Sequence, residues 1–211
     1  MVSQLPPRGL YAITPADLAG EALLGAVRKV ITGGAVMIQY RAKETSTTTD
    51  ARALQQLCAA LGTPLIINDD PALAAGIGAA GVHLGRDDAD PDEARRVLGP
   101  GGIIGVSCYD SLERARAAVA QGADYVAFGR FFPSRSKPSA VQAPLSLLER
   151  ARAEIAKPIV AIGGITPDNG ADLIAAGADL LAVIEGVFGA ADRRQTARRY
   201  AELFAAANPT H

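Results

Sequence analysis

Short apolar runs alternate with stretches rich in Ala, Leu and Arg along the whole 211-residue chain. The apolar runs predict strands at residues 9–13, 35–39, 65–67, 81–84, 103–107, 125–128, 159–162 and 180–184. The stretches between them predict helices at residues 17–31, 48–61, 71–78, 91–98, 111–120, 144–156, 167–176 and 190–205. Continuous apolar strands indicate burial on both faces, and helical connections indicate a parallel sheet with right-handed crossovers.

Repetition of this strand–helix unit predicts an α/β fold with a single domain, a (β/α)8 TIM barrel over residues 1–211. Segments 76–84, 120–128 and 175–183 echo one another weakly, because each carries a glycine where a helix ends and the next strand follows. Glycine at that point supplies the left-handed turn of a helix end. The competing fold is an open doubly wound sheet, which usually has a glycine-rich turn after its first strand. Thr14-Pro15-Ala16 stands there instead, which favours the barrel.

Composition excludes several classes of partner. Hydrophobic residues make up 49% of the chain, and the lack of Trp with only 5% aromatic residues predicts an aliphatic core. The 21 basic and 22 acidic residues nearly cancel, so we expect neither nucleic acid nor a membrane surface as partner. No long apolar run or leader-like segment is visible, and Cys58 and Cys108 lie in apolar surroundings. We therefore expect a cytoplasmic protein with reduced thiols, and a homo-oligomer is compatible with this composition.

Three polar residues that follow predicted strands have a structural explanation. Asp70, Asp90 and Thr166 each stand directly before a proline. Proline favours the first position of a helix, so the residue before it is the N-cap, and Asp and Thr side chains are good caps. We therefore assign these three residues to helix starts.

The other acids near these strand ends have no such explanation. Asp69 follows the third predicted strand beside Asn68, and Asp87 and Asp88 follow the fourth. The carboxyl ends of barrel strands meet at one face, so these side chains are expected to lie close together. Carboxylates from adjacent strands with an amide beside them suit a hard divalent cation that keeps some waters, such as Mg²⁺.

Cationic and glycine residues at the same face predict an anionic ligand. Arg41 and Lys43 follow the second strand, and Lys137 follows the sixth. Gly163-Gly164 after the seventh strand offers bare backbone N–H groups, a common phosphate cradle. Together they indicate an enzyme that handles a diphosphate and a second phosphorylated compound. His83 lies within a predicted buried strand, and we expect a hydrogen-bonded core role for it.

Six runs of residues together resemble a known enzyme family. The runs at 38–43, 67–70 and 81–88 resemble those of thiamine-phosphate synthase, and so do the runs at 104–107, 123–137 and 161–165. The resemblance covers nearly the whole chain in order and implies a (β/α)8 transferase. Such an enzyme joins hydroxymethylpyrimidine diphosphate to thiazole phosphate, forming thiamine phosphate and diphosphate. The resemblance further implies a dissociative reaction assisted by Mg²⁺, in which electrostatic stabilisation of the leaving group matters more than a general base.

The resemblance also assigns the site residues. It places the pyrimidine diphosphate on Gln39, Arg41, Lys43, Asn68, Ser107 and Lys137, with Lys137, Arg41 and Ser107 acting in catalysis. It places the thiazole phosphate on Ser134, Ser136, Gly163, Ile184 and Glu185. It places Mg²⁺ on Asp69 and Asp88.

Two departures from the family pattern bear on the second substrate. Ser134-Arg135-Ser136-Lys137 stands where the family has Thr-x-Thr-Lys, which keeps the hydroxyls and adds a charge. Glu185 stands where a serine often contacts the thiazole phosphate. A carboxylate there repels phosphate unless it turns away or pairs with Arg130 or Arg135.

Three other hypotheses compete with this interpretation. A thiazole tautomerase-like relative shares the barrel but needs no diphosphate site, and the acids with Lys137 argue against it. A non-catalytic barrel that binds a phosphorylated metabolite has its only support in Glu185 and the altered loop. A different phosphate-binding barrel, such as a tryptophan-pathway enzyme, gives no reason for acids at adjacent strand ends.

Overall fold

The computed structural model describes residues 5–41, 48–86, 88–133 and 142–207 of the chain. Its strands are β1 (Gly9–Ile13), β2 (Ala35–Tyr40), β3 (Leu65–Asn68), β4 (Gly81–Leu84), β5 (Ile103–Tyr109), β6 (Tyr125–Phe128), β7 (Ile159–Ile162) and β8 (Leu180–Val183). Its helices are α1 (Gly20–Thr32), α2 (Thr48–Ala60), α3 (Pro71–Ile77), α4 (Pro91–Leu98), α5 (Leu112–Ala120), α6 (Ser146–Glu154), α7 (Gly170–Ala175), α8 (Glu185–Phe188) and α9 (Arg193–Ala206).

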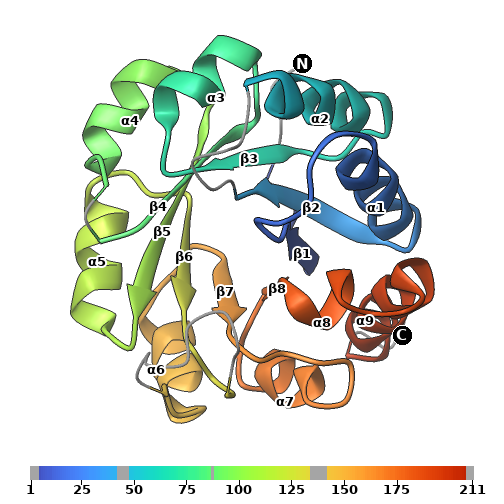
Figure 1. Cartoon of the computed structure of the whole chain (residues 1–211). Coiled ribbons are helices and arrows are strands. Elements are labelled where there is room, and N and C mark those ends of the chain that lie inside the picture. The colour runs from blue at the N-terminus through green and yellow to red at the C-terminus, as the bar shows by residue number, and fades with distance from the viewer. Residues whose placement is uncertain (1–4, 42–47, 87, 134–141, 208–211) are drawn as a thin grey trace.

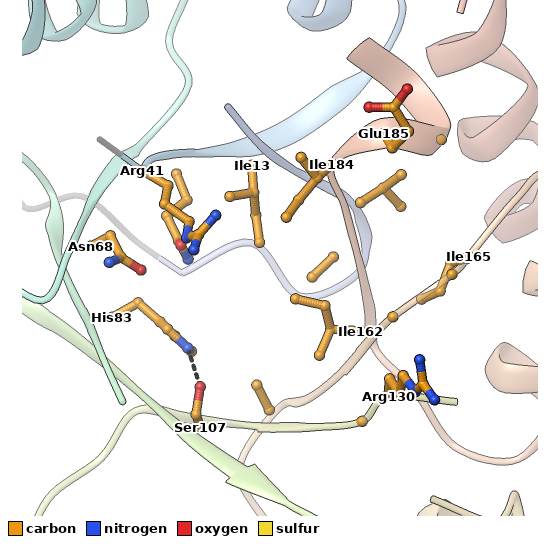
Figure 2. Close-up of a pocket in the computed structure, with 18 of the residues that line it drawn as sticks. Ile13, Arg41, Asn68, His83, Ser107, Arg130, Ile162, Ile165, Ile184 and Glu185 are labelled. Atoms are coloured by element: carbon orange, nitrogen blue, oxygen red, sulfur yellow. Dashed lines mark hydrogen bonds between the residues drawn. The ribbon is translucent and has the colours of Figure 1, made fainter. Parts of the chain in front are cut away.

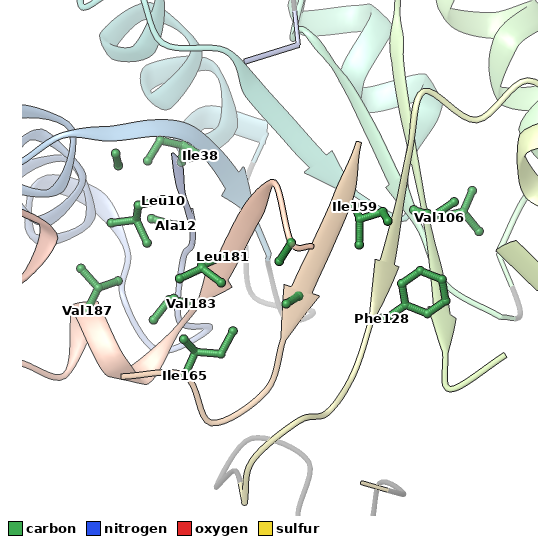
Figure 3. Packing of buried hydrophobic residues seen from close by; sticks show 14 of the residues in the cluster. Leu10, Ala12, Ile38, Val106, Phe128, Ile159, Ile165, Leu181, Val183 and Val187 are labelled. Atoms are coloured by element: carbon green, nitrogen blue, oxygen red, sulfur yellow. The ribbon is translucent and has the colours of Figure 1, made fainter. Parts of the chain in front are cut away.

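The strands form a closed parallel barrel in sequence order, with β8 paired to β1, and the helices surround it (Figure 1). The predicted (β/α)8 TIM barrel is therefore confirmed. One cluster of buried side chains lies between the strands and the helices, and Figure 3 shows part of it, with Leu181 and Val183 near Ile165 and Val187. A smaller cluster fills the barrel interior. Its two fully buried aromatic residues are Tyr11 and Tyr125, so the interior is not purely aliphatic.

The predicted N-caps at Asp70 and Asp90 have different outcomes. Asp70 has extended backbone before Pro71, and its carboxylate accepts a hydrogen bond from the Leu73 N–H at 2.8 Å, so its capping role is confirmed. Asp90 occupies the cap position of α4, but its side chain makes no capping hydrogen bond. For Asp90 the position was predicted correctly and the side-chain interaction was not.

The segment after β7 differs from the prediction. Thr166 does not cap a helix that starts at residue 167, because α7 begins at Gly170. The Thr166 hydroxyl instead accepts a hydrogen bond from the Asp168 N–H, and the Asn169 side chain accepts one from the Thr166 N–H. Residues 166–169 therefore form a turn held by these side chains, and the helix starts three residues later than predicted.

Two of the three glycine echoes in the sequence, those before β6 and β8, share an ion-pair arrangement. The Asp179 carboxylate accepts hydrogen bonds from the Ile159 N–H and from Arg152, both at 2.8 Å. Asp124 joins β5 and β6 in the same way, and its carboxylate pairs with Arg95 at 2.7 Å. Each aspartate thus ties the start of one strand to its neighbour and to an outer helix.

Replacement of Asp179 by alanine is expected to lower the free energy of unfolding by about 2–3 kcal/mol, because it leaves a strand N–H and an arginine without their charged partner. Asp168, whose side chain is 80% exposed in its pair with Arg199, supplies a matched control. Asp168→Ala is expected to cost less than about 1 kcal/mol. Urea unfolding of both variants checks this, and equal losses would contradict the structural role of Asp179.

Candidate active site

A cavity of about 360 Å³ opens at the carboxyl-terminal mouth of the barrel. Its wall has a polar side and an apolar side (Figure 2). The polar side carries Arg41, Asn68, His83 and Ser107, and the apolar side carries Ile13, Ile162 and Ile184. Gln39, Ala127 and Ala182 also line the cavity. Such a wall fits a ligand with a flat, partly apolar ring and polar groups at one edge.

The structure brings Asp69 and Asp88 together. The carboxyl of Asp69 accepts a hydrogen bond from the Asn68 amide, and the Asp88 carboxyl lies close enough to interact with it. Asp88 also accepts a hydrogen bond from the Gly85 N–H at 2.5 Å, which folds its carboxylate back toward the end of β4. Asp69 has a left-handed backbone, with φ of 66°, and its N–H donates to the His83 carbonyl at 2.8 Å. The two acids are therefore held by their backbones at the ends of adjacent strands.

Desolvation and the neighbouring Asp88 raise the pKa of Asp69 to about 6, while Arg41 and Asn68 act in the opposite direction. Asp69 is exposed, so solvent screens part of this effect. Two carboxyl groups this close repel each other when both are ionised. A bound cation would relieve that repulsion.

The donor set of these residues fits Mg²⁺. Among the described residues there is no cluster of three or more His, Cys, Asp or Glu side chains, and Asp69 and Asp88 are the two carboxylates that meet here. Mg²⁺ typically binds one or two carboxylates and fills its shell with waters and substrate phosphates. Asp69 and Asp88 are not part of the cavity wall, but Asn68, next to Asp69, is. Asp69 and Asp88 would hold the ion at the edge of the cavity.

Five interior side chains, each from a different strand, form a continuous series of hydrogen bonds that we call the interior chain. Gln39 Nε2 donates to the Tyr11 hydroxyl at 2.6 Å, and the Tyr11 and Tyr125 hydroxyls are 2.9 Å apart. The Tyr125 hydroxyl is 2.9 Å from His83 Nδ1, and His83 Nε2 is 2.9 Å from Ser107 Oγ. The expected hydrogen-bonded, buried role of His83 is confirmed, and His83 also contributes to the cavity wall.

Tyr11 and Tyr125 were not among the residues predicted for the site. Both lie in apolar strands, where an aromatic residue is typical of a packed core. Gly105 offered a sequence signal for Tyr125, because a glycine inside a strand often marks a site where another group approaches the backbone closely. A side chain at Gly105 would collide with the Tyr125 ring. The glycine makes room for the tyrosine to cross the barrel interior.

Arg114 was also missed, and it fixes the strand ends that carry the polar wall. Its guanidinium donates to the carbonyls of Ser107 at 2.8 Å and Gly85 at 2.9 Å. Tyr109, the last residue of β5, has a left-handed φ of 56° and carries the Arg86 guanidinium over its ring at 4.6 Å. Arg114 thereby joins the end of β5 to the loop that leads to Asp88.

The loops after β7 and β8 form the opposite edge of the cavity. Gly163 and Gly164 have φ values of 105° and 66°, and a side chain on either would collide with the segment after β6. Both glycines line the cavity, as do Ile184 and Glu185 at the start of α8. The glycines therefore let this loop pack against its neighbour while its backbone faces the ligand space.

Glu185 turns its carboxylate away from the centre of the cavity (Figure 2). A side chain added at Gly189 would collide with Glu185 Oε1, so the carboxylate extends toward the end of α8. The exposed position of Glu185 lets water solvate its charge. The carboxylate therefore turns away from the cavity, as one of the two expectations requires, whereas Arg135, a partner named in the other, lies outside the described residues.

Some predicted site residues cannot be placed. Lys43, Asp87, Ser134, Ser136 and Lys137 lie outside the described residues. The structure brings Gln39, Arg41, Asn68, Ser107, Gly163, Ile184 and Glu185 to one cavity, with Asp69 and Asp88 beside it.

The fold and this cavity together define a class of protein. In (β/α)8 barrels the loops at the carboxyl ends of the strands carry the active site, and the loops after strands seven and eight frequently bind phosphate. A ligand cavity at that mouth, with polar groups from several strand ends, is the arrangement of a barrel enzyme.

Comparisons with known proteins identify the family. The profile of the thiamine monophosphate synthase family matches residues 10–187. The chain is 56% identical to thiamine-phosphate synthase of Azoarcus sp. (strain BH72) over 201 residues, which cover 94% of this chain and 98% of that protein. It is 52% identical to thiamine-phosphate synthase of Methylococcus capsulatus over 207 residues, covering 97% and 92%. The structure matches thiamine phosphate pyrophosphorylase from Pyrococcus furiosus with a TM-score of 0.83 and 33% identity, covering 93% of this chain and 95% of that chain.

The chain therefore belongs to the thiamine monophosphate synthase family and is a transferase. The predicted family and enzyme class are confirmed. No helix among the described residues has the length and apolar character needed to span a membrane.

Proposed function

We propose that this protein joins 4-amino-2-methyl-5-hydroxymethylpyrimidine diphosphate to a thiazole phosphate, giving thiamine phosphate and diphosphate. The observation that carries the proposal is the meeting of Asp69 and Asp88 beside a cavity with one polar and one apolar side. The acids and Arg41 suit a diphosphate with its cation, and the apolar wall suits two stacked heterocycles. The glycine pair after β7 suits the second phosphate.

The proposed reaction is dissociative. The bond between the pyrimidine methylene carbon and the diphosphate oxygen breaks first, and its electron pair leaves with the diphosphate. The electron-rich aminopyrimidine ring stabilises the cation that remains. The lone pair of the thiazole nitrogen then forms the new carbon–nitrogen bond, so no proton has to be removed from the nucleophile. When bound, Mg²⁺ supplies positive charge to the departing diphosphate.

The chain's own residues supply orientation and charge for these steps. Arg41 places a guanidinium in the cavity wall near Asp69, where it can pair with diphosphate oxygens. Gln39 and Ser107 supply polar groups to the cavity wall, where they would bind the pyrimidine ring, and Ile13 and Ile162 lie on the apolar side. By sequence resemblance, Lys137 completes the positive charge around the leaving group.

A substrate analogue with an electron-poor pyrimidine ring tests the dissociative step. A trifluoromethyl group in place of the 2-methyl group withdraws electrons and destabilises a ring-centred cation. The analogue is expected to react at least about a hundredfold more slowly, a barrier increase of about 2.7 kcal/mol. Single-turnover quench measurements isolate this step from product release. Equal rates for the two substrates would argue for direct displacement by the thiazole nitrogen.

A further inference from the structure

The hydrogen bonds of the interior chain have a direction. Tyr11 and Tyr125 are fully buried, and burial raises the pKa of both hydroxyls far above the usual value, so each keeps its proton at neutral pH. Each hydroxyl therefore has one proton to donate. Within the described part of the chain, the Tyr11 hydroxyl has two hydrogen-bond partners, Gln39 and Tyr125. Because Gln39 Nε2 donates to it, the Tyr11 proton is left to point at Tyr125.

The next hydroxyl of the interior chain can be treated in the same way, by assigning its one proton to the partner that can accept it. The Tyr125 oxygen accepts from Tyr11, so the Tyr125 proton is directed to its other partner, His83 Nδ1. A neutral imidazole has one nitrogen that accepts and one that donates. If Nδ1 accepts, then Nε2 carries the proton and donates to Ser107 Oγ. The opposite direction would leave the buried Tyr11 hydroxyl with two donors facing it and no described acceptor for its own proton, which is costly.

We propose that the interior chain locks His83 in the Nε2–H tautomer and thereby makes Ser107 a hydrogen-bond donor to the cavity. Ser107 Oγ accepts from His83, and its own proton is free to meet a ligand atom. Tyr11, Tyr125 and His83 are positioning residues, because they act on the ligand space through Ser107.

The direction of these hydrogen bonds also argues against Ser107 as a nucleophile with His83 as its general base. A serine and a histidine 2.9 Å apart resemble a nucleophile with its general base. That chemistry requires Nε2 to accept the serine proton while Nδ1–H donates to a third group. Here the third group is the Tyr125 hydroxyl, which donates to Nδ1, so His83 cannot take the proton of Ser107.

The chemical consequence concerns the ligand. The atom that meets Ser107 must accept a hydrogen bond, as an unprotonated ring nitrogen of a heteroaromatic compound does. This statement about the ligand rests on the proposed function, whereas the tautomer of His83 does not. An experiment can therefore contradict the statement about the ligand without contradicting the tautomer of His83, and the reverse.

Nitrogen NMR of the histidines tests the tautomer directly. The chain has only two histidines, His83 and His211, so a His211→Gln variant labelled with ¹⁵N-histidine reports on His83 alone. We expect a protonated-type Nε2 resonance with an attached proton and an unprotonated-type Nδ1 resonance. A protonated Nδ1, or signals averaged between the two tautomers, would overturn the proposal.

A second variant tests the role of Tyr125. Tyr125→Phe removes the donor to His83 Nδ1, so the Nδ1 resonance is expected to shift downfield while Nε2 stays protonated. If the hydrogen bonds of the interior chain were donated in the opposite direction, this variant would remove the acceptor of Nδ1–H, and the proton would move to Nε2. Tyr200→Phe is the matched control, because it removes a buried hydroxyl that donates to the Ile165 carbonyl outside the interior chain. It is expected to leave both His83 resonances unchanged. Should Tyr125→Phe fail to fold, the spectrum of the parent protein still decides the tautomer.

Discussion

Replacement of Asp69 or Asp88 by asparagine is expected to lower kcat by about a thousandfold or more, because a neutral amide cannot hold Mg²⁺ against the diphosphate as a carboxylate does. The fold is expected to survive. The raised pKa of Asp69 means that the folded protein binds a proton at this carboxyl more tightly than the unfolded chain does. Ionising it above about pH 6 therefore opposes folding, so asparagine should leave the melting temperature at neutral pH unchanged or raise it.

Asp70 provides the matched control for this prediction. It is adjacent to Asp69, but its carboxylate caps α3 through the Leu73 N–H. Asparagine caps helices about as well as aspartate, so Asp70→Asn is expected to leave kcat and the melting temperature close to those of the parent protein. Steady-state kinetics and thermal melts of the three variants check this. Similar losses of activity in all three would contradict the division between metal-binding and capping acids.

Removal of Arg41 is expected to lower kcat/KM for the pyrimidine diphosphate by about 10²–10³-fold, because the guanidinium can bind leaving-group oxygens in pairs. Its backbone N–H bonds the Thr14 hydroxyl at 3.0 Å, a contact that an alanine at position 41 keeps. We therefore expect little change in the free energy of unfolding. Arg41 is also a charge that lowers the pKa of Asp69, so Arg41→Ala should raise that pKa further.

Arg41→Lys separates charge from geometry. Lysine keeps the positive charge but not the planar fork, so we expect an activity between those of the parent protein and Arg41→Ala. Steady-state kinetics at saturating thiazole phosphate give the comparison. Parent-like kcat/KM in Arg41→Ala would remove this residue from the leaving-group site.

The fold could be predicted from sequence because its signals are local. Each strand is a short apolar run, and the bounds of β1, β4, β6 and β7 agree with the prediction. The turn at residues 166–169 could not be predicted from the Thr-Pro pair, because the Asn169 side chain and the Thr166 N–H close it. Helix α8 was missed, since it is a single turn that follows β8 directly.

The site could be predicted in part. Residues at the ends of strands, such as Asn68 and Ser107, followed from the rule that barrel sites lie at the carboxyl ends. The interior chain did not follow, because its members come from five strands and no spacing in the sequence joins Tyr11 to Tyr125. The orientation of Glu185, whose carboxylate packs against Gly189, was left open between turning away and pairing with an arginine.

One measurement tests the central proposal most directly: the amounts of thiamine phosphate and diphosphate formed by the purified protein from the two substrates. With both substrates and Mg²⁺ present, we predict equal amounts of both products, and no thiamine phosphate when either substrate is omitted or when the metal is chelated. The Asp69→Asn variant should form both products at the strongly reduced rate given above. Release of diphosphate without an equal amount of thiamine phosphate, or absence of thiamine phosphate, with both substrates and Mg²⁺ present would contradict the proposed function.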